Sequence, residues 1–153
     1  MQEAILDIRN LTLEAGDLKL VSGIGMKLER GKFTGLAGES GSGKTLTALS
    51  ILGLLPPAVK MTAGSILFSP SQGPAVDLAT LSPKKMHDVR GHRISMIFQE
   101  PMTSLNPSMR CGRQVAEVIR LHLGRDRRSV RSRVIDLFHE VKLPDPSRMY
   151  RSW

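Results

Sequence analysis

Eight consecutive residues carry the clearest chemistry in this sequence, because together they form the pattern Gly-x-x-x-x-Gly-Lys-Ser/Thr. They are Gly38, Glu39, Ser40, Gly41, Ser42, Gly43, Lys44 and Thr45. Glycines let the backbone bring successive N–H groups close to phosphate oxygens, where a β-carbon would obstruct them. A lysine here reaches the β- and γ-phosphates, and the hydroxyl that follows it is a magnesium ligand. The pattern therefore predicts a phosphate-binding loop for a nucleotide and Mg²⁺.

The elements on either side of this loop must be a strand and a helix for the pattern to bind phosphate. Residues 32–37 are mostly apolar, and we predict a buried strand there. The pattern of residues 45–52 predicts a helix whose first N–H groups point at the phosphates. Leu46 lies in the first turn of this helix and is therefore the last residue of the predicted binding segment. The alternative is a chance match in a glycine-rich turn, which would not require this order of elements.

Hydrophobic patterns predict the remaining elements of the N-terminal part. Apolar residues from Ile5 to Leu13 and from Val21 to Leu28 indicate an antiparallel hairpin around the turn at 14–17. A third strand is predicted over 65–68, followed by a loop over 69–74. Ser82 and Pro83 predict the start of a short helix, and residues 93–98 predict a second buried strand.

From about residue 111 the apolar residues repeat with helical spacing. The two predicted stripes are Val115, Val118, Ile119 and His122, then Val130, Val134, Leu137, Phe138 and Val141. Several arginines lie between and within these helices, and most of them fall away from the stripes. They are either a solvated helix face or a contact face for an acidic partner or membrane headgroups.

Composition limits the class of protein. A chain of 153 residues with 41% hydrophobic and 24% charged residues suits one soluble domain. Cys111 is the single cysteine, which excludes an internal disulfide and suits a reducing compartment. No stretch approaches the roughly 18 apolar residues that a membrane span needs. A net charge of +8 leaves nucleic-acid binding open, although aromatic residues, at 4%, offer little for base stacking.

A second motif narrows the family. The segment Ile97-Phe98-Gln99-Glu100-Pro101-Met102-Thr103-Ser104-Leu105-Asn106-Pro107 resembles the glutamine loop of ABC transporter ATPases. The residues of the phosphate-binding loop resemble those in the branch of this family that serves oligopeptide, dipeptide and nickel importers. The segment after the helix, Leu52-Gly53-Leu54-Leu55-Pro56, resembles the same branch. This resemblance runs from the N-terminus to the last residue.

The resemblance implies a fold and a set of roles. The fold would be α/β of the P-loop NTPase type, with an N-terminal antiparallel β-subdomain, a partial parallel core sheet and the start of a helical subdomain. Residues 1–109 would hold the β-subdomain and P-loop core, and residues 110–153 the start of the helical subdomain. Lys44 and Gln99 would be catalytic, with Thr45 and Gln99 at the Mg²⁺ of bound ATP. The implied partners are permease subunits and a second ATPase subunit, at the cytoplasmic face of the membrane, with no specific nucleic acid.

Two departures from the family pattern have consequences. Ala15 stands where relatives often carry an aromatic residue that stacks on adenine. The sequence also contains no Leu-Ser-Gly-Gly segment and no apolar run ending in Asp-Glu. We therefore expect an N-terminal part of an importer ATPase that is inactive alone. The alternatives are a non-catalytic nucleotide-binding or interaction module and a basic nucleic-acid-binding protein.

Overall fold

The computed structural model describes residues 4–99, 105–123 and 126–152. The chain forms two compact units, Met1–Ser95 and Met96–Trp153, and each is described by itself below. Within the described ranges, no helix is both long and apolar enough to cross a membrane.

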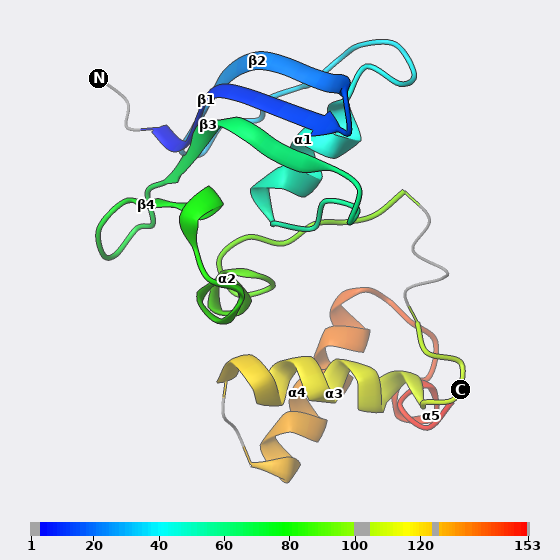
Figure 1. The fold of residues 1–153 in the computed structure, drawn as a ribbon. Coiled ribbons are helices and arrows are strands. Elements are labelled where there is room, and N and C mark those ends of the chain that lie inside the picture. Colours follow the sequence, from blue (N-terminus) through cyan, green and yellow to red (C-terminus); the bar gives the residue numbers. More distant parts are fainter. Residues whose placement is uncertain (1–3, 100–104, 124–125, 153) are drawn as a thin grey trace. The chain divides into compact units, whose positions relative to one another are not determined.

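The first unit is built on a four-stranded antiparallel sheet in the order β2-β1-β3-β4 (Figure 1). Its strands are β1 (Ala4–Ala15), β2 (Leu18–Glu29), β3 (Lys60–Phe68) and β4 (Val76–Asp77). The predicted hairpin is confirmed, and Gly16 takes the positive φ of 58° that its tight turn needs. The predicted third strand is also confirmed, but it starts earlier than expected.

A β-bulge divides β1 into two halves. Asn10 has a φ of 49°, and the register of β1 shifts between Ile8 and Leu11 against β2. Side chains alternate between the two faces of a strand, so one extra residue reverses the alternation. Leu6 and Ile8 before the bulge, and Leu11 and Leu13 after it, are therefore all buried. Gly64 on β3 makes room for the bulge, because a β-carbon there would lie 2.6 Å from the Asn10 carbonyl oxygen.

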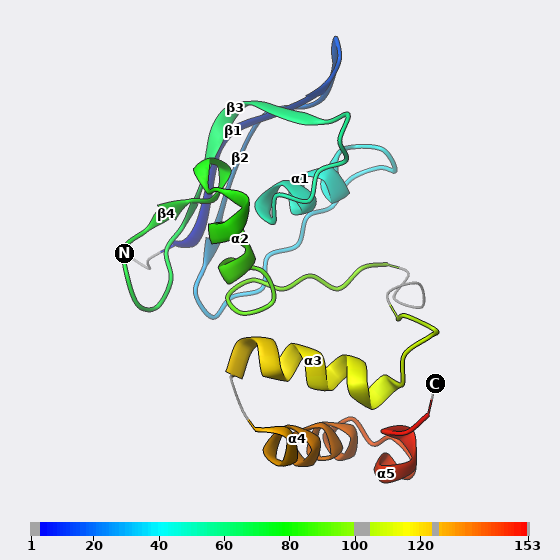
Figure 2. The ribbon, with the colours of Figure 1, turned by 60° about the horizontal axis from the view of Figure 1, so that its bottom comes forward.

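Helices cover one face of this sheet (Figures 1 and 2). They are α1 (Lys44–Ile51), the 3₁₀-helix η1 (Leu78–Thr80) and α2 (Pro83–Val89). Met86 and Val89 of α2 and Leu78 of η1 pack into the same core as the apolar residues of β1. The predicted start of α2 is confirmed: the Ser82 hydroxyl accepts a hydrogen bond from the Lys85 amide at 3.5 Å.

The two strands predicted for a parallel core sheet are not formed, and this corrects the expectation. Residues 32–37 have no regular secondary structure and are exposed. Residues 93–98 contain only an isolated bridge, between Arg90 and Ile94. An apolar run becomes a strand only where a neighbouring strand hydrogen-bonds to it, and in the described part of the chain neither run has one. Phe33 is consequently 106% exposed and Ile97 92% exposed.

The second unit consists of α3 (Cys111–Leu123), α4 (Arg127–Glu140) and α5 (Pro146–Met149). Its core holds Ala116 and Ile119 of α3 with Val130, Val134 and Phe138 of α4. The two predicted helices are confirmed. The predicted stripes are wrong at Val118 and Val141, which are 56% and 66% exposed; Ala116 takes the buried place on α3.

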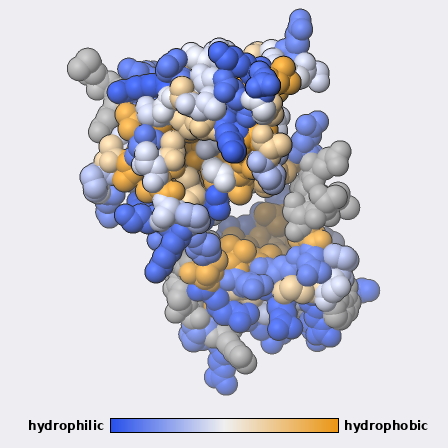
Figure 3. Space-filling model, viewed as in Figure 1, coloured by the Kyte–Doolittle hydropathy of each residue, from blue (hydrophilic) through white to orange (hydrophobic). Residues whose placement is uncertain are grey.

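Hydrophilic residues cover much of the visible face of this helical unit (Figure 3). The Asp126 carboxylate caps α4, accepting hydrogen bonds from the Arg128 amide at 2.8 Å and the Ser129 amide at 3.0 Å. Arg133 forms an ion pair with Glu140 at 2.9 Å. The arginines of α4 that face solvent therefore fit the solvated-face interpretation for this helix.

Candidate functional site: the phosphate-binding loop

The loop predicted to bind phosphate leads directly into α1. Gly43 is the N-terminal cap of this helix and has a φ of 87°, with no side chain that could bond the first amides. The first four N–H groups of a helix have no partner within it, and the helix dipole makes this end positive. No acidic residue in the first turn of α1 neutralises that charge. The end of α1 therefore presents donors and positive potential to an anion.

Gly43 has no space for a side chain, and Gly38 lies close to the side chain of Ser42. A β-carbon at Gly43 would lie 2.6 Å from Cγ2 of Val21 and 3.2 Å from the Leu20 carbonyl oxygen, so the loop rests directly on β2. A β-carbon at Gly38 would lie 2.8 Å from the Ser42 hydroxyl. The contacts and the φ of 87° give a physical reason for glycine at Gly43, beyond the pattern itself, whereas the Ser42 hydroxyl could rotate away from a side chain at Gly38.

The Lys44 ammonium lies inside the curve of the loop. It donates hydrogen bonds to the carbonyl oxygens of Gly38 at 2.8 Å and Glu39 at 2.5 Å, and to the Ser42 hydroxyl at 3.2 Å. The Ser42 amide in turn bonds the Glu39 carbonyl at 3.3 Å. The loop backbone is therefore wrapped around one positive charge at the start of α1.

The neighbouring hydroxyls differ in their surroundings. Thr45 is exposed in the first turn of α1, as a magnesium ligand has to be. Thr47 is buried, and its hydroxyl donates to the Gly43 carbonyl at 3.0 Å. Leu46 is half-buried and packs against the core of the sheet. Ser40 and Gly41 form the exposed outer part of the loop.

Gln99 belongs to the second unit, where it is an exposed residue in a bend. The loop belongs to the first unit, so contact of Gln99 with Mg²⁺ or with an attacking water stays a prediction. Residues 100–104 of the glutamine-loop motif lie outside the described residues. The end of that motif is held by Gln114, whose side chain bonds the Asn106 amide and carbonyl, both at 3.0 Å.

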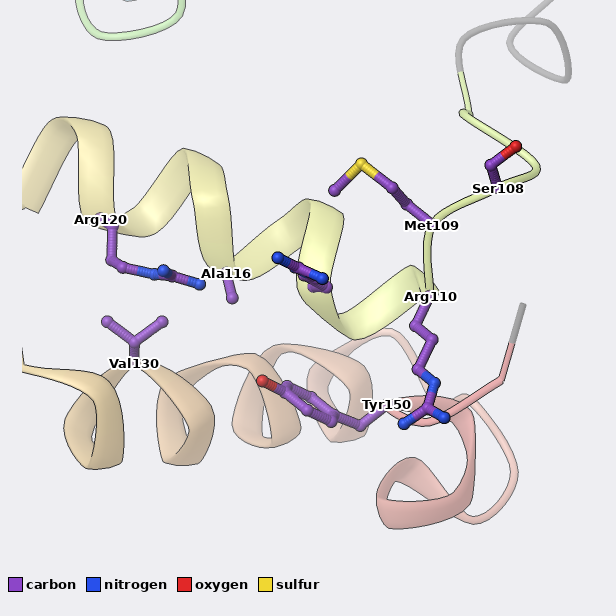
Figure 4. Close-up of a pocket in the computed structure, with 8 residues that line it drawn as sticks. Ser108, Met109, Arg110, Ala116, Arg120, Val130 and Tyr150 are labelled. Carbon is purple, nitrogen blue, oxygen red and sulfur yellow. The ribbon is translucent and has the colours of Figure 1, made fainter.

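Sequence reasoning missed a cavity of about 540 Å³ in the second unit (Figure 4). Its lining combines the apolar groups of Ala116, Val130 and Tyr150 with three arginines. The arginines are Arg110, Arg113 and Arg120. Arg113, Ala116 and Arg120 are spaced to lie on one face of α3, and this spacing is the sequence signal that could have identified the cavity.

The sequence of the chain resembles those of known proteins. Residues 21–152 match the ABC transporter family. The chain is 38% identical to the dipeptide transport ATP-binding protein DppD of Bacillus subtilis strain 168, over 99% of this chain and 45% of that protein. It is 40% identical to the probable D,D-dipeptide transport ATP-binding protein DdpD of Escherichia coli K12, over 95% of this chain and 44% of that protein.

A third relative is the oligopeptide transport ATP-binding protein OppD of Bacillus subtilis strain 168, which is 36% identical over 94% of this chain and 40% of that protein. The chain thus spans less than half the length of these curated relatives. The family match covers most of the chain and includes the phosphate-binding loop, α1 and the three helices of the second unit. On this match, the chain belongs to the ABC transporter family of ATP-binding proteins.

Proposed function

We propose that this chain binds Mg-ATP at residues 38–46 and forms the nucleotide-binding part of a peptide importer. The observation that carries the proposal is the loop wrapped around the Lys44 ammonium at the uncapped start of α1. Such a loop binds phosphate through backbone N–H groups, a lysine and the helix dipole together. The peptide substrate is inferred from the names of the relatives, which are dipeptide and oligopeptide transport proteins.

In this proposal Lys44 neutralises the β- and γ-phosphates, and the Thr45 hydroxyl binds the magnesium ion. Gln99 contacts the same ion and the attacking water, and connects the nucleotide to the helical unit. The helical unit docks on permease subunits at the cytoplasmic face of the membrane. Its arginine-lined surface suits a site beside anionic groups.

Calorimetric titration with Mg-ATP tests the binding step. We expect saturable binding that is lost in Lys44→Ala and unchanged in Lys85→Ala, which removes an exposed lysine of α2. Thr45→Ala should remove the dependence of affinity on Mg²⁺, and Thr45→Ser should keep it. Binding that survives Lys44→Ala would contradict the assignment of the loop.

Turnover is a separate question. Phosphoryl transfer requires magnesium held by the loop hydroxyl and by a Walker-B carboxylate, with a positioned water. Phosphate binding by the loop needs the backbone N–H groups and the Lys44 ammonium but no Walker-B carboxylate, so the second candidate is a nucleotide-binding module without turnover. Under this candidate, phosphate release does not exceed that of Lys44→Ala; release that depends on Lys44 would exclude it.

The transported solute can be tested in cells. Deleting the gene should reduce uptake of a labelled dipeptide, since the relatives named above are peptide transport proteins. Loss of nickel uptake with unchanged dipeptide uptake would instead support the nickel branch of the importers.

A further inference from the structure

We propose that Arg90 is a positioning residue for the phosphate-binding loop and acts through the opposite end of α1. The inference rests on the proposed function, because it concerns the affinity of that loop for Mg-ATP. Arg90 is the C-terminal cap of α2, and 46 positions separate it from Lys44 in the sequence. It is therefore not part of the phosphate-binding motif.

The Arg90 guanidinium bonds the last carbonyl groups beyond α1. Its Nε donates to the Leu52 carbonyl oxygen at 2.7 Å, and its Nη2 donates to the Gly53 carbonyl oxygen at 2.8 Å. Two parallel donors on adjacent carbonyls fix position and direction, which a single bond or a lysine ammonium cannot do. The contact therefore fixes the position of the C-terminal end of α1.

This contact also supplies a charge that α1 lacks. The C-terminal end of a helix is negative, and a cation there is stabilising. The last turn of α1 contains no basic residue. Arg90 brings a positive charge to that end from another element, while the N-terminal end is left open to a phosphate. The positive charge at the C-terminal end of α1 and the open N–H groups at its N-terminal end therefore both favour a bound anion.

The sequence around Gly53 is adapted to this contact. Gly53 has a φ of 60°, and a β-carbon there would lie 3.2 Å from Nη2 of Arg90 and 3.6 Å from Cε of Met86. Arg90 itself is half-buried, and its amide bonds the Met86 carbonyl at 3.0 Å. Arg90, Gly53 and Met86 also line a cavity of about 390 Å³ together with Leu78 and Ala79 of η1.

A short helix transmits a displacement from one end to the other. At about 1.5 Å per residue, an eight-residue helix is about 12 Å long and moves as one body. Its N-terminal end touches Val21 through Gly43, and its C-terminal end is held by Arg90. Releasing the second contact lets α1 shift along its axis or tilt, which moves the N–H groups that face the phosphates.

The test compares Arg90→Gln and Arg90→Lys with Arg93→Gln, a control that removes an exposed arginine three residues away. Mg-ATP affinity is measured by calorimetry well below the thermal midpoint of each variant. Hydrogen exchange is followed in peptides that cover residues 44–54. We expect about tenfold weaker binding in Arg90→Gln, which corresponds to about 1.4 kcal/mol. Arg90→Lys, which keeps the charge but not the paired donors, should recover part of the loss.

A purely structural cap would lower the thermal midpoint and leave the affinity of the folded protein unchanged. Affinity of Arg90→Gln within about twofold of the unmodified chain would therefore overturn the proposal, and so would an equal loss in Arg93→Gln. Gly53→Ala provides a second route, because it displaces the same guanidinium. Its effect on affinity should not add to that of Arg90→Gln if both act through this contact.

The experiment separates this inference from the proposed function. If the unmodified chain does not bind Mg-ATP, the proposed function fails, and the exchange data still decide whether Arg90 holds the end of α1. Faster exchange of residues 52–54 in Arg90→Gln, with unchanged exchange in Arg93→Gln, would support the positional role. If the chain binds Mg-ATP and neither affinity nor exchange responds to Arg90, only the present inference is wrong.

Discussion

A β-carbon on Gly43 would lie 2.6 Å from Cγ2 of Val21, which places the phosphate-binding loop in direct contact with β2. The contact joins a functional loop to the sheet at a point where no side chain fits. Under the proposed function, this contact makes nucleotide binding depend on the N-terminal hairpin.

Gly43→Ala should destabilise the first unit and abolish Mg-ATP binding. The new methyl group clashes with Val21, and the φ of 87° is strained for alanine, so we expect a loss of about 1–3 kcal/mol in the free energy of unfolding. Urea titration followed by circular dichroism measures this loss. Val21→Ala removes the clash with Cγ2 but not the backbone strain, and it has a cost of its own because Val21 is buried. The double variant is therefore compared with Val21→Ala alone, and Gly43→Ala should cost less in that background but still lower stability. No cost in that background would show that the backbone conformation contributes nothing.

The Asp7–Arg9 pair should make stability depend on acid pH. The pKa of the Asp7 carboxyl lies below its ordinary value, chiefly because the Arg9 guanidinium donates hydrogen bonds to Oδ2 at 2.8 and 2.6 Å. Burial opposes this shift, and the charges of Arg9 and Lys27 add to it. A lowered pKa in the folded state stabilises the protein above the ordinary Asp value of about 3.9, and this stabilisation is lost as the pH falls through the folded pKa.

Thermal unfolding between neutral and strongly acidic pH tests this. The unmodified chain should lose stability below about pH 4 more steeply than Asp7→Asn. Asp88→Asn, on the exposed side of α2, should follow the unmodified chain. Identical pH profiles for Asp7→Asn and the unmodified chain would show that the pair does not contribute.

Gly112→Ala should destabilise the helical unit selectively. Gly112 packs against the ring and carbonyl of Tyr150, so a β-carbon there would overlap the ring. We expect a cost of about 1–3 kcal/mol, as for other overpacked cores. Hydrogen exchange should report faster opening of α3 and α5, with the sheet unaffected. Gly35→Ala is the control, because nothing lies within 4 Å of a β-carbon at that position.

Phe33→Ser should reduce self-association. Phe33 is 106% exposed in a segment that no strand among the described residues pairs with, and an unpaired apolar backbone segment is a template for association. Val118→Ser removes another exposed apolar side chain, 56% exposed, but from the middle of α3, where the backbone groups bond within the helix. Sedimentation at increasing concentration should show a larger effect at Phe33. Equal effects would mean that exposure alone, and not the unpaired backbone, drives association.

Local sequence patterns predicted the elements whose formation depends on residues close to one another in the sequence. The hairpin, the phosphate-binding loop, α1 and the start of α2 follow from turn residues, glycines and a proline at the first helical position. The strands at 32–37 and 93–98 could not be predicted in the same way. Their formation depends on partners that hydrogen-bond to them, and an apolar run alone does not supply these partners.

Contacts between residues that are far apart in the sequence could not be predicted from sequence patterns either. Nothing in the spacing of Arg90 and Gly53 indicates that the guanidinium reaches the end of α1. Helical periodicity located α3 and α4 and most of their buried residues, but it missed Ala116, which is 1% exposed, and wrongly included Val118, which is 56% exposed. The predicted roles of Gln99 and Thr45 remain predictions for the experiments above.

The bulge at Asn10 divides β1 into two halves. The buried apolar residues fall at even-numbered positions before the bulge and at odd-numbered positions after it. Removing Asn10 would restore strict alternation and leave Leu11 and Leu13, both now 0% exposed, on the same face as Leu6 and Ile8. The extra residue therefore changes the spacing of the buried residues in the sequence and not the face of the sheet that they occupy. When this chain is aligned with others, a single-residue gap near position 10 is compatible with an unchanged core.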